Sequence, residues 1–328
     1  MNTIFDIKSE ADFRSACIET FRYQYDNNPI YQQFVDYLKV DPTRVQEVEK
    51  IPFLPIEMFK NHQVLDKNYQ TDFYFQSSGT TQMVRSKHFI PDLKLYEESI
   101  YKSFEHFIGD PKEYIFLGLL PNYSENPHSS LIYMIDYLMK ESGKTENGYF
   151  LYNHEELYKI LVNLKDKKVL LFGVSFALLD FIYFMADNDL DLVSLDKSNL
   201  TVIETGGMKG RKKEMTKDEL LDILKEGFNT DRICSEYSMT ELLSQAYSLE
   251  DNSYQTPAWM RILIRNVEDP FSYIPDGRTG AINIIDLANR HSCSFIATQD
   301  LGKYEGNSFQ VLGRIDHSDI RGCSLLVS

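Results

Sequence analysis

Strand-like and helix-like segments alternate through the middle of this 328-residue chain, and this alternation restricts the possible fold more than any other feature. Four apolar segments with strand character are each followed by a segment whose apolar residues have helical spacing. The strand segments are residues 114–120, 148–152, 168–174 and 200–204, and the helical segments are residues 129–140, 154–164, 175–185 and 212–228. Strands that are joined by helices favour a parallel sheet. We therefore expect an α/β unit with mostly parallel strands.

The two ends of the chain have different predicted secondary structure from the middle. Residues 9–39 predict two helices, which Asn27-Asn28-Pro29 separates. Beyond residue 258, short strand candidates are separated by turn residues, and they occupy residues 259–264, 280–286, 294–298 and 309–312. We expect one module over residues 1–328, with a helical lead-in (1–60), an α/β core (61–257) and a β-rich end (258–328).

Composition excludes several classes of protein. The formal net charge of −15 argues against a general nucleic-acid or membrane-surface binder. No secretory signal opens the chain, and no run of 18 or more apolar residues could span a bilayer, so we expect a cytoplasmic protein. The four cysteines, at positions 17, 234, 293 and 323, have neither metal-ligand spacing nor the density of a disulfide framework.

A short loop rich in hydroxyl groups lies between aromatic Phe75 and apolar Phe89. Its candidate phosphate-binding residues are Ser77, Ser78, Gly79, Thr80 and Thr81. Glycine permits close backbone approach, successive backbone N–H groups form anion nests, and hydroxyls donate to phosphate oxygens. The alternative is a polar hairpin turn. The loop does not match the P-loop pattern, because no Gly-Lys-Ser/Thr follows.

Four further motifs follow in a fixed order. They are Thr205-Gly206-Gly207-Met208-Lys209-Gly210-Arg211, Glu236-Tyr237-Ser238-Met239-Thr240-Glu241, Thr298-Gln299-Asp300 and Gly313-Arg314-Ile315-Asp316. Together with the loop, this series resembles the adenylate-forming superfamily of acyl-CoA synthetases, peptide-synthetase adenylation domains and firefly luciferase. The segments at residues 51–60 and 318–324 resemble one branch of it, the LuxE-type acyl-protein synthetases. The resemblance spans roughly residues 50–328.

The resemblance implies a fold and a set of nucleotide-binding residues. The fold would be the large N-terminal domain of the superfamily, with mixed and parallel sheets packed with helices, a β-rich end, and no small C-terminal lid domain. The loop Ser77–Thr81 would grip the β- and γ-phosphates of ATP. Gly206, Gly207 and the Tyr237 ring would contact adenine. Asp300 would accept hydrogen bonds from both ribose hydroxyls, and Arg314 would contact ribose or phosphate.

Two more residues would carry the chemistry of adenylation. By resemblance, Thr240 reaches the α-phosphate and Glu241 helps to bind Mg²⁺, so the implied ligands are ATP and Mg²⁺. A hydroxyl suits an oxyanion, and a hard carboxylate suits a hard cation. The alternative for this segment is a helix start in which Ser or Thr is the cap and Glu lies in the first turn.

The sequence departs from the superfamily pattern at three places. Gln82 stands where glycine is usual, and no lysine follows the loop, which leaves Arg85 or Lys87 as the candidate cation. The chain stops twelve residues after Asp316, so the lysine of the lid domain has no counterpart by position. Slower adenylation, a second chain or Lys303 are the open alternatives.

Cys323 lies where the LuxE type carries its acyl acceptor. In that type, the acyl group of acyl-AMP passes to a cysteine near the C-terminus and then to a partner such as a reductase or carrier. A thiolate attacks a mixed anhydride readily, and Arg321 could lower the thiol pKa. The alternative is a small buried hydrophobe in a last strand. Cys234 is a weaker rival, whereas Cys17 and Cys293 have the character of structural residues.

The leading hypothesis is therefore an ATP-dependent enzyme that activates a carboxylic acid, with fatty acids as the expected class. It would form acyl-AMP and transfer the acyl group to Cys323 or to a partner protein. Two alternatives stay open. One is a ligase that passes acyl-AMP to coenzyme A or to a carrier protein, and the other is a degenerate nucleotide-binding subunit.

Overall fold

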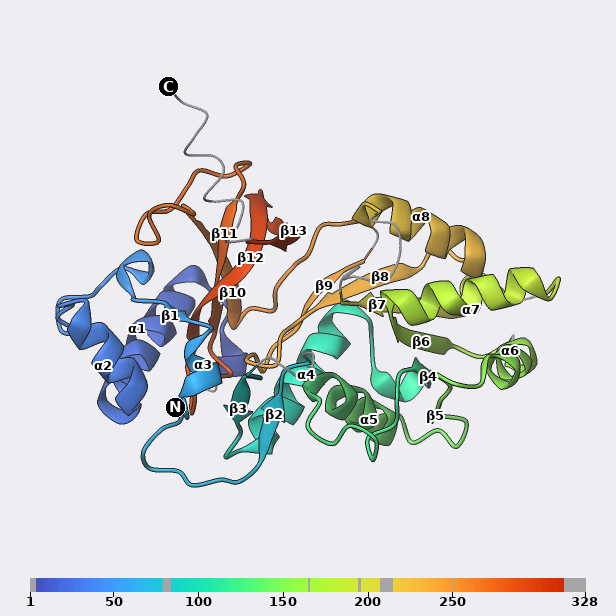
Figure 1. Cartoon of the computed structure of the whole chain (residues 1–328), viewed down its shortest axis with the longest axis horizontal. Coiled ribbons are helices and arrows are strands. Elements are labelled where there is room, and N and C mark those ends of the chain that lie inside the picture. The colour runs from blue at the N-terminus through green and yellow to red at the C-terminus, as the bar shows by residue number, and fades with distance from the viewer. Residues whose placement is uncertain are drawn as a thin grey trace. The chain divides into compact units, whose positions relative to one another are not determined.

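The computed structural model describes residues 4–78, 84–164, 166–193, 196–206, 215–249 and 251–315. The chain divides into two compact units, whose helices and strands are labelled in Figure 1. Unit 1 comprises Met1–Met58, Val64–Lys67 and Ala258–Ser328, and unit 2 comprises Phe59–Gln63 and Asn68–Pro257. Each unit builds its own β-sheet.

The central sheet of unit 2 has six strands. They are β4 (Ile115–Leu119), β5 (Gly148–Tyr149), β6 (Val169–Val174), β7 (Leu200–Thr205), β8 (Ile233–Tyr237) and β9 (Ala246–Ser248). The strand order is β5-β4-β6-β7-β8-β9, and every neighbouring pair is parallel except the antiparallel pair β8 and β9. Strands β4, β6 and β7 are almost wholly buried, as expected for a parallel sheet with covered faces. The predicted α/β unit is confirmed.

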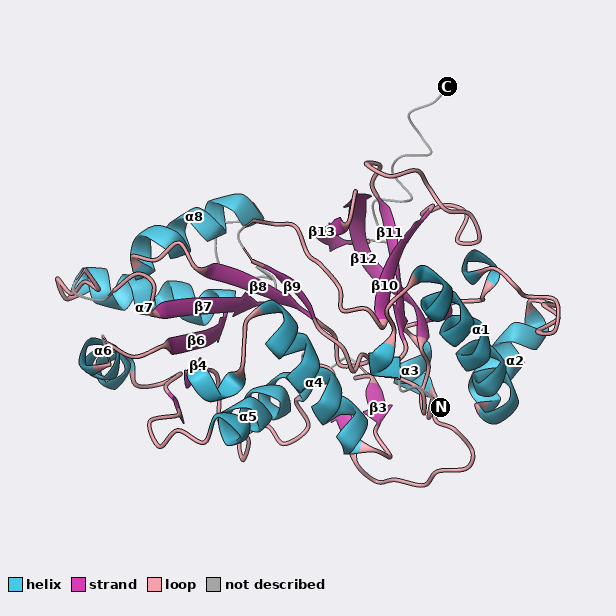
Figure 2. Cartoon of the chain, turned by 180° about the vertical axis from the view of Figure 1, so that it is seen from behind, coloured by secondary structure: helices cyan, strands magenta, loops and turns pink. Residues whose placement is uncertain are grey.

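Helices cover both faces of this sheet. They are α4 (Leu93–Phe107), α5 (Ser130–Ser142), α6 (His154–Asn163), α7 (Ser175–Asp187) and α8 (Lys217–Phe228). Figure 2 shows α7 and α8 along one face, and α4 and α5 along the other. Leucines from α6, α7 and α8 share one apolar core with residues of β4, β6 and β7, and the core includes Leu161, Leu171, Leu178 and Leu224. A 3-10 helix, Pro111–Glu113, leads into β4.

A separate two-stranded hairpin in unit 2 consists of β2 (Tyr74–Gln76) and β3 (Lys87–Phe89). The short helix α3 (Met58–Asn61) comes before it in the chain. Phe75 is completely buried, and its ring meets the rings of Tyr96 and Tyr133 at 5.4 and 5.5 Å between centroids. Because Tyr96 lies on α4 and Tyr133 on α5, these aromatic contacts fix the hairpin to both helices.

Unit 1 contains a five-stranded sheet and two helices. The strands are β1 (Leu54–Pro55), β10 (Met260–Arg265), β11 (Gly280–Asp286), β12 (Phe295–Glu305) and β13 (Ser308–Arg314). The order is β1-β12-β11-β10, and β13 pairs with β12. All pairs are antiparallel except the parallel pair β1 and β12. Short 3-10 helices occur at Ile4–Asp6 and Val48–Lys50.

Helices α1 (Glu10–Asn27) and α2 (Pro29–Tyr37) of unit 1 confirm the helix pair that was predicted for the N-terminal region. Asn28 separates them, because its side chain accepts hydrogen bonds from the backbone N–H groups of Ile30 and Tyr31 at 3.1 Å and so caps α2. Pro29 occupies the first helical position, where no N–H donor is needed. The Gln24 side chain ties α1 to the sheet through Ser294.

The structure corrects several boundaries. Helix α8 begins at Lys217, behind a capping box of Thr216 and Glu219, and not at residue 212 as predicted. Strand β12 runs to Glu305, well beyond the predicted end at residue 298. Strands β8 and β9 were not predicted, because β8 carries charged Glu236 and the apolar pattern is short. The proposed single module with three sub-regions stays a prediction.

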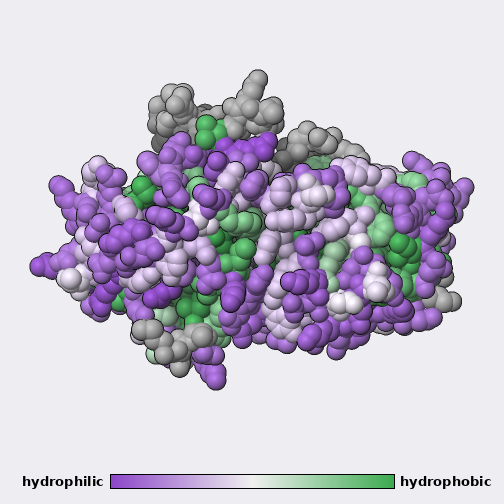
Figure 3. Space-filling model, turned by 90° about the horizontal axis from the view of Figure 1, so that it is seen from below, coloured by the Kyte–Doolittle hydropathy of each residue, from purple (hydrophilic) through white to green (hydrophobic). Residues whose placement is uncertain are grey.

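One face of the molecule shows how polar and apolar residues are distributed on the surface. The face drawn in Figure 3 is mostly hydrophilic, with apolar patches scattered between polar side chains. In the part of the chain that the structure describes, no helix has both the length and the apolar character needed to cross a bilayer.

Candidate active site

The base of the candidate phosphate loop lies at the connected end of the β2–β3 hairpin, next to the pair formed by Gln76 and Lys87. The Ser77 N–H donates to the Ser86 carbonyl at 3.1 Å, and the Ser86 N–H donates to Ser77 Oγ at 3.0 Å. These two hydrogen bonds between Ser77 and Ser86 join the two ends of the loop. Ser78 follows as an exposed residue, whereas Gly79, Thr80 and Thr81 lie outside the described residues, as does Gln82.

Two contacts hold the base of this loop against the Thr240–Glu241 turn. The Ser86 hydroxyl donates a short hydrogen bond to Glu241 Oε1, and His88 Nδ1 lies 2.9 Å from the Thr240 carbonyl oxygen. Ser86, His88 and Glu241 are all buried. Two motifs that are far apart in the sequence thus meet in one place within unit 2.

Ser86 and His88 are site residues that the sequence reasoning missed. The sequence signal for these two residues is weak. Ser86 lies just before β3 and His88 lies within it, and side chains two positions apart along a strand face the same side. The Phe59 ring meets the His88 ring edge-on at 5.6 Å and helps to hold the imidazole in place. Lys87 points the other way, with its ammonium 4.5 Å from the Tyr74 ring centroid, and Arg85 is exposed.

The segment around Tyr237 is a strand end followed by a turn. Tyr237 is the last residue of β8, and residues 240–241 form a turn in which the Leu242 N–H donates to the Met239 carbonyl at 3.0 Å. The alternative in which this segment begins a helix is therefore wrong. Tyr237 is half-buried, and its ring meets the Tyr254 ring at 6.0 Å with an interplanar angle of 62°.

Gly206 directly follows β7, and Tyr237 ends the neighbouring strand β8. The two strands are parallel with Thr205 opposite Glu236, so both candidate adenine contacts lie at the carboxyl edge of the sheet. Ligands of open parallel sheets bind at this edge. Gly206 has φ of +88°, and a Cβ atom there would meet no neighbour within 4 Å, so its backbone conformation is the reason for glycine. Gly207 lies outside the described residues.

Buried glutamates stand at the ends of both strands. Glu204 accepts short hydrogen bonds from the Ser175 hydroxyl and from the Lys217 ammonium, and only 1% of its side-chain surface is exposed. On the next strand, Thr205 Oγ1 donates a short hydrogen bond to Glu236 Oε2. Burial raises the pKa of Glu236 to about 7, against hydrogen bonds from Ser238 and Thr205 that favour its charged form.

The candidate ribose contacts lie in unit 1, on adjacent strands. Asp300 on β12 is opposite Arg314 on β13, and Arg314 Nε lies 3.2 Å from Asp300 Oδ1. The Asp300 N–H donates to Thr298 Oγ1 at 3.0 Å, which fixes the backbone of the motif. Lys303, the candidate replacement for the missing lysine, pairs with Glu305 at 3.2 Å. The candidate residues are therefore grouped in two sets, one in each unit.

The described cysteines are all buried. Burial raises the pKa of Cys17 and of Cys293 to about 12, which leaves little nucleophilic thiolate and agrees with a structural role. Cys234 lies within β8, and its Sγ is 3.7 Å from the Leu249 carbonyl oxygen. Cys323, the candidate acyl acceptor, lies outside the described residues.

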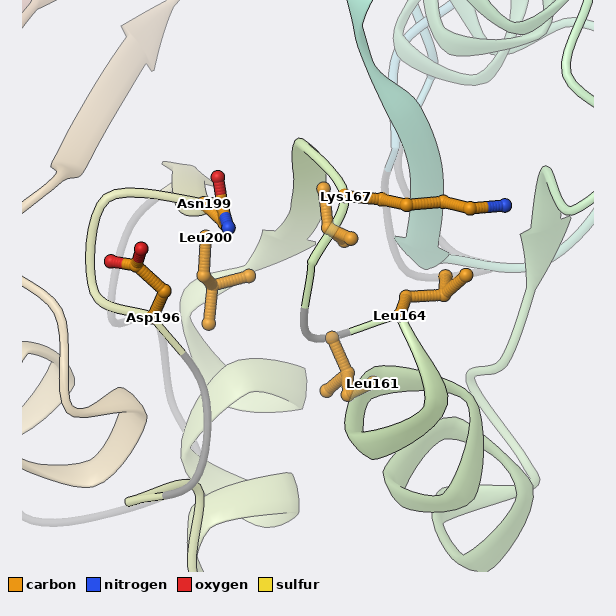
Figure 4. A pocket seen from close by; sticks show the side chains of 7 residues that line it. Leu161, Leu164, Lys167, Asp196, Asn199 and Leu200 are labelled. Carbon is orange, nitrogen blue, oxygen red and sulfur yellow. The ribbon is translucent and has the colours of Figure 1, made fainter.

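A small pocket lies at the opposite edge of the unit 2 sheet (Figure 4). It is lined by Leu161, Leu164, Lys167, Val169, Asp196, Asn199 and Leu200. Val169 and Leu200 are the first residues of β6 and β7, so the pocket marks the amino edge of the strands. Its volume is only about 10 Å³, far below the roughly 300 Å³ at which ligand pockets begin. We assign it no part in the site.

Comparison with solved structures identifies the fold. A 2-hydroxyisobutyryl-CoA ligase in complex with 2-HIB-AMP and CoA matches 94% of this chain and 70% of its own, with a TM-score of 0.72 at 10% identity. ATP-bound MatB from Rhodopseudomonas palustris matches 74% of this chain and 47% of its own, with a TM-score of 0.52 at 14% identity. The chain thus has the α/β fold of the adenylate-forming ligases.

A third structure shares this fold. The luciferase-like enzyme from the nonluminescent mealworm Zophobas morio matches 85% of this chain and 62% of its own, with a TM-score of 0.56 at 13% identity. At sequence level, the family described as acyl-protein synthetase, LuxE, matches residues 5–93 and 129–328. The chain belongs to this family of acyl-activating ligases. No curated protein matched the sequence.

Proposed function

We propose that this chain activates a carboxylic acid, with fatty acids as the expected class, by forming acyl-AMP from ATP, and then transfers the acyl group to a thiol. In the first step a carboxylate oxygen bonds to the α-phosphorus, the bond to the β-phosphate oxygen breaks, and pyrophosphate leaves. In the second step a thiolate sulfur bonds to the acyl carbon and AMP leaves, while the thiol proton passes to solvent. Membership of the LuxE family supports this reaction.

The observation that carries the proposal is the contact between the loop base and the Thr240–Glu241 turn. Ser86 and His88, at the end of the hydroxyl-rich loop, hold Glu241 and the Thr240 backbone against the base of this loop. A loop for the β- and γ-phosphates and a hydroxyl for the α-phosphate must lie side by side, because the phosphates are joined. Positioning and charge neutralisation are the main demands of this chemistry.

The other candidate residues then take consistent roles. Gly206 and the Tyr237 ring, at the carboxyl edge of adjacent strands, would approach adenine. Asp300 would accept hydrogen bonds from both ribose hydroxyls, and Arg314 beside it would contact ribose or phosphate. The hydroxyl-rich residues Ser77, Ser78, Thr80 and Thr81, with Gly79 and Gly207, would complete the nucleotide contacts by resemblance.

Glu241 is suited to a magnesium ion that arrives with the nucleotide. Within the described ranges no cluster of three or more His, Cys, Asp or Glu side chains could hold a resident metal. Mg²⁺ is usually held by one or two carboxylates together with substrate phosphates and water. When bound, the ion would neutralise the charge on the phosphates. Glu241 contributes a carboxylate whose place is fixed by Ser86.

Labelled pyrophosphate exchange into ATP tests the first step. Exchange should depend on an added acid from a panel of short-chain, long-chain and aromatic acids, and Glu241→Ala should abolish it. Glu97→Ala is a matched control, because the Tyr133 hydroxyl donates to Glu97 Oε1 at 2.7 Å in the same unit, as Ser86 does to Glu241. Exchange by Glu97→Ala but not by Glu241→Ala supports the proposal. Absence of exchange with every acid, in folded protein that binds ATP, contradicts it and favours a degenerate nucleotide-binding subunit.

Protein-bound acyl groups test the second step. After incubation with ATP and a labelled acid, wild-type protein should retain hydroxylamine-sensitive label, and Cys323→Ser should not. A partner that accepts the acyl group, such as a reductase or carrier protein, would then be loaded from the labelled enzyme. If Cys323→Ser keeps the label, the acceptor is a different group.

Transfer to coenzyme A is a second candidate, which the match to a ligase solved with 2-HIB-AMP and CoA favours. Both reactions share the acyl-AMP step and differ only in the thiol. Formation of free acyl-CoA by Cys323→Ser at the wild-type rate would establish this alternative.

A further inference from the structure

We propose that Tyr254 is a positioning residue for the nucleotide base. In this proposal the Tyr254 ring fixes the orientation of the Tyr237 ring, and the ion pair between Lys217 and the buried Glu204 holds the Tyr254 hydroxyl. The inference rests on the proposed function, in which Tyr237 stacks on adenine. Tyr254 itself need not touch the nucleotide.

The first link is the contact between the two rings. Tyr237 and Tyr254 meet with 6.0 Å between ring centroids and an interplanar angle of 62°. Edge-to-face pairs at this separation are favourable, because the positive edge of one ring lies against the negative face of the other. Tyr254 is 5% exposed, whereas Tyr237 is half-buried. The buried ring therefore supports the more accessible one.

The second link fixes the backbone that carries Tyr254. The Tyr247 N–H donates to the Gln255 carbonyl at 3.1 Å, and the Gln255 N–H donates to the Tyr247 carbonyl at 2.8 Å. This pair of hydrogen bonds attaches the segment after β9 to the edge of the sheet. Tyr254 thus stands on an ordered part of the fold and can hold a neighbour in place.

The third link is the ion pair behind Tyr254. The Lys217 ammonium hydrogen-bonds to the Tyr254 hydroxyl and, by a short contact, to Glu204. Lys217 is the first residue of α8, Glu204 lies near the end of β7, and Ser175 at the start of α7 donates to the same carboxylate. Breaking a buried pair leaves an unpaired charge, so this cluster has one well-defined arrangement.

The orientation of the Tyr237 ring should affect how tightly the nucleotide base binds, and not how tightly the phosphates bind. Stacking on a purine requires a flat ring in the correct orientation, and it tolerates many bases because every base has a π-face. The candidate phosphate-binding residues belong to a different segment, the loop that connects β2 to β3. Loss of the Tyr254 ring should therefore weaken the contribution of the base to binding while the triphosphate contribution stays the same.

Calorimetric titration with ATP and with inorganic tripolyphosphate, each with Mg²⁺, separates the two contributions. We expect Tyr254→Leu to weaken ATP binding about tenfold and to leave tripolyphosphate binding unchanged. Tyr254→Phe, which keeps the ring and loses the hydrogen bond to Lys217, should have a smaller effect of the same kind. It also tests the proposal if Tyr254→Leu does not fold.

Tyr114 provides matched controls in the same unit. It is 4% exposed, its hydroxyl donates to the Ile108 carbonyl at 3.0 Å, and its ring meets Phe104 edge-on at 6.1 Å. Tyr114→Leu and Tyr114→Phe should lower the free energy of unfolding by about as much as the corresponding Tyr254 variants do. They should leave the ratio of the ATP affinity to the tripolyphosphate affinity at its wild-type value.

Four outcomes would overturn the inference. If both Tyr254 variants bind ATP like wild type, or lose ATP and tripolyphosphate equally, Tyr254 has only a structural role. If wild type binds ATP but Tyr237→Ala binds it equally well, Tyr237 is not the base platform. If wild type binds neither ligand, the proposed function fails, and this inference fails with it.

Discussion

The Ser86 hydroxyl donates a hydrogen bond to the carboxylate of Glu241, a residue 155 positions further along the chain. Both side chains are buried, and the neighbouring contact between His88 and the Thr240 carbonyl runs alongside. This relationship joins the hydroxyl-rich loop to the turn that follows Tyr237. It also defines which residues hold Glu241 in position.

Ser86→Ala should weaken both the fold and the proposed reaction. The change leaves one Glu241 oxygen without its hydroxyl donor in a buried place, which should cost about 1–3 kcal/mol of unfolding free energy. Pyrophosphate exchange should fall by about tenfold or more because the carboxylate loses its fixed orientation. Urea unfolding and exchange kinetics measure the two effects. Ser86→Thr, which keeps the hydroxyl, should recover part of the activity, and equal loss in both variants would argue against this role.

The raised pKa of Glu236 predicts a pH-dependent stability. The folded state holds this proton up to about pH 7, whereas the unfolded state releases it near the ordinary value of 4.5. The contribution of Glu236 to the free energy of unfolding is therefore greatest below pH 4.5, falls as the pH rises to about 7, and then levels off. The total change should be on the order of 3 kcal/mol.

Glu236→Gln tests this prediction, because the amide keeps the shape of a protonated carboxyl. Denaturant unfolding between pH 5 and pH 8 should show a flatter profile for the variant than for wild type. The variant should gain stability relative to wild type at the upper end of this range. Parallel profiles would mean that Glu236 is charged in the folded protein.

Lys217→Met should destabilise unit 2 strongly. It removes the cation from a carboxylate of which only 1% is exposed, and breaking such a pair costs about 3–5 kcal/mol. The double variant with Glu204→Gln should recover much of the loss, since no unpaired charge remains. Chemical unfolding of both variants measures the difference, and an additive double variant would contradict the coupling.

Asp300→Ala should remove recognition of the ribose hydroxyls. Wild type should prefer ATP to 2′,3′-dideoxy-ATP in competitive binding, and the variant should bind the two nucleotides alike. The Arg314 side chain is 54% exposed, so the ion pair itself should add little to stability. Unchanged discrimination in a folded Asp300→Ala protein would exclude Asp300 from the ribose site.

The order of the main elements could be predicted because its causes are local. Apolar runs at 169–174 and 200–205 fit buried strands, and helical spacing at 175–187 fits a covering helix. Strand β8 was not predicted because Glu236 interrupts its apolar pattern. The Glu236 side chain can be buried because Thr205 of the neighbouring strand donates a hydrogen bond to it. A cross-strand partner leaves no mark in the local sequence.

The sequence by itself determined the succession of the main strands and helices, the helix break at Asn27-Asn28-Pro29 and the motifs that resemble an adenylate-forming ligase, because each of these depends on neighbouring residues. Only the tertiary structure decided that Ser86 holds Glu241 and that Lys217 connects Glu204 to Tyr254. The Ser86–Glu241 contact exists because the β2–β3 hairpin meets the turn that follows β8. The Lys217–Glu204 contact exists because α8 begins at the edge of the parallel sheet where β7 ends. Side chains that are distant in sequence then share one buried environment, in which an unpaired polar group is costly.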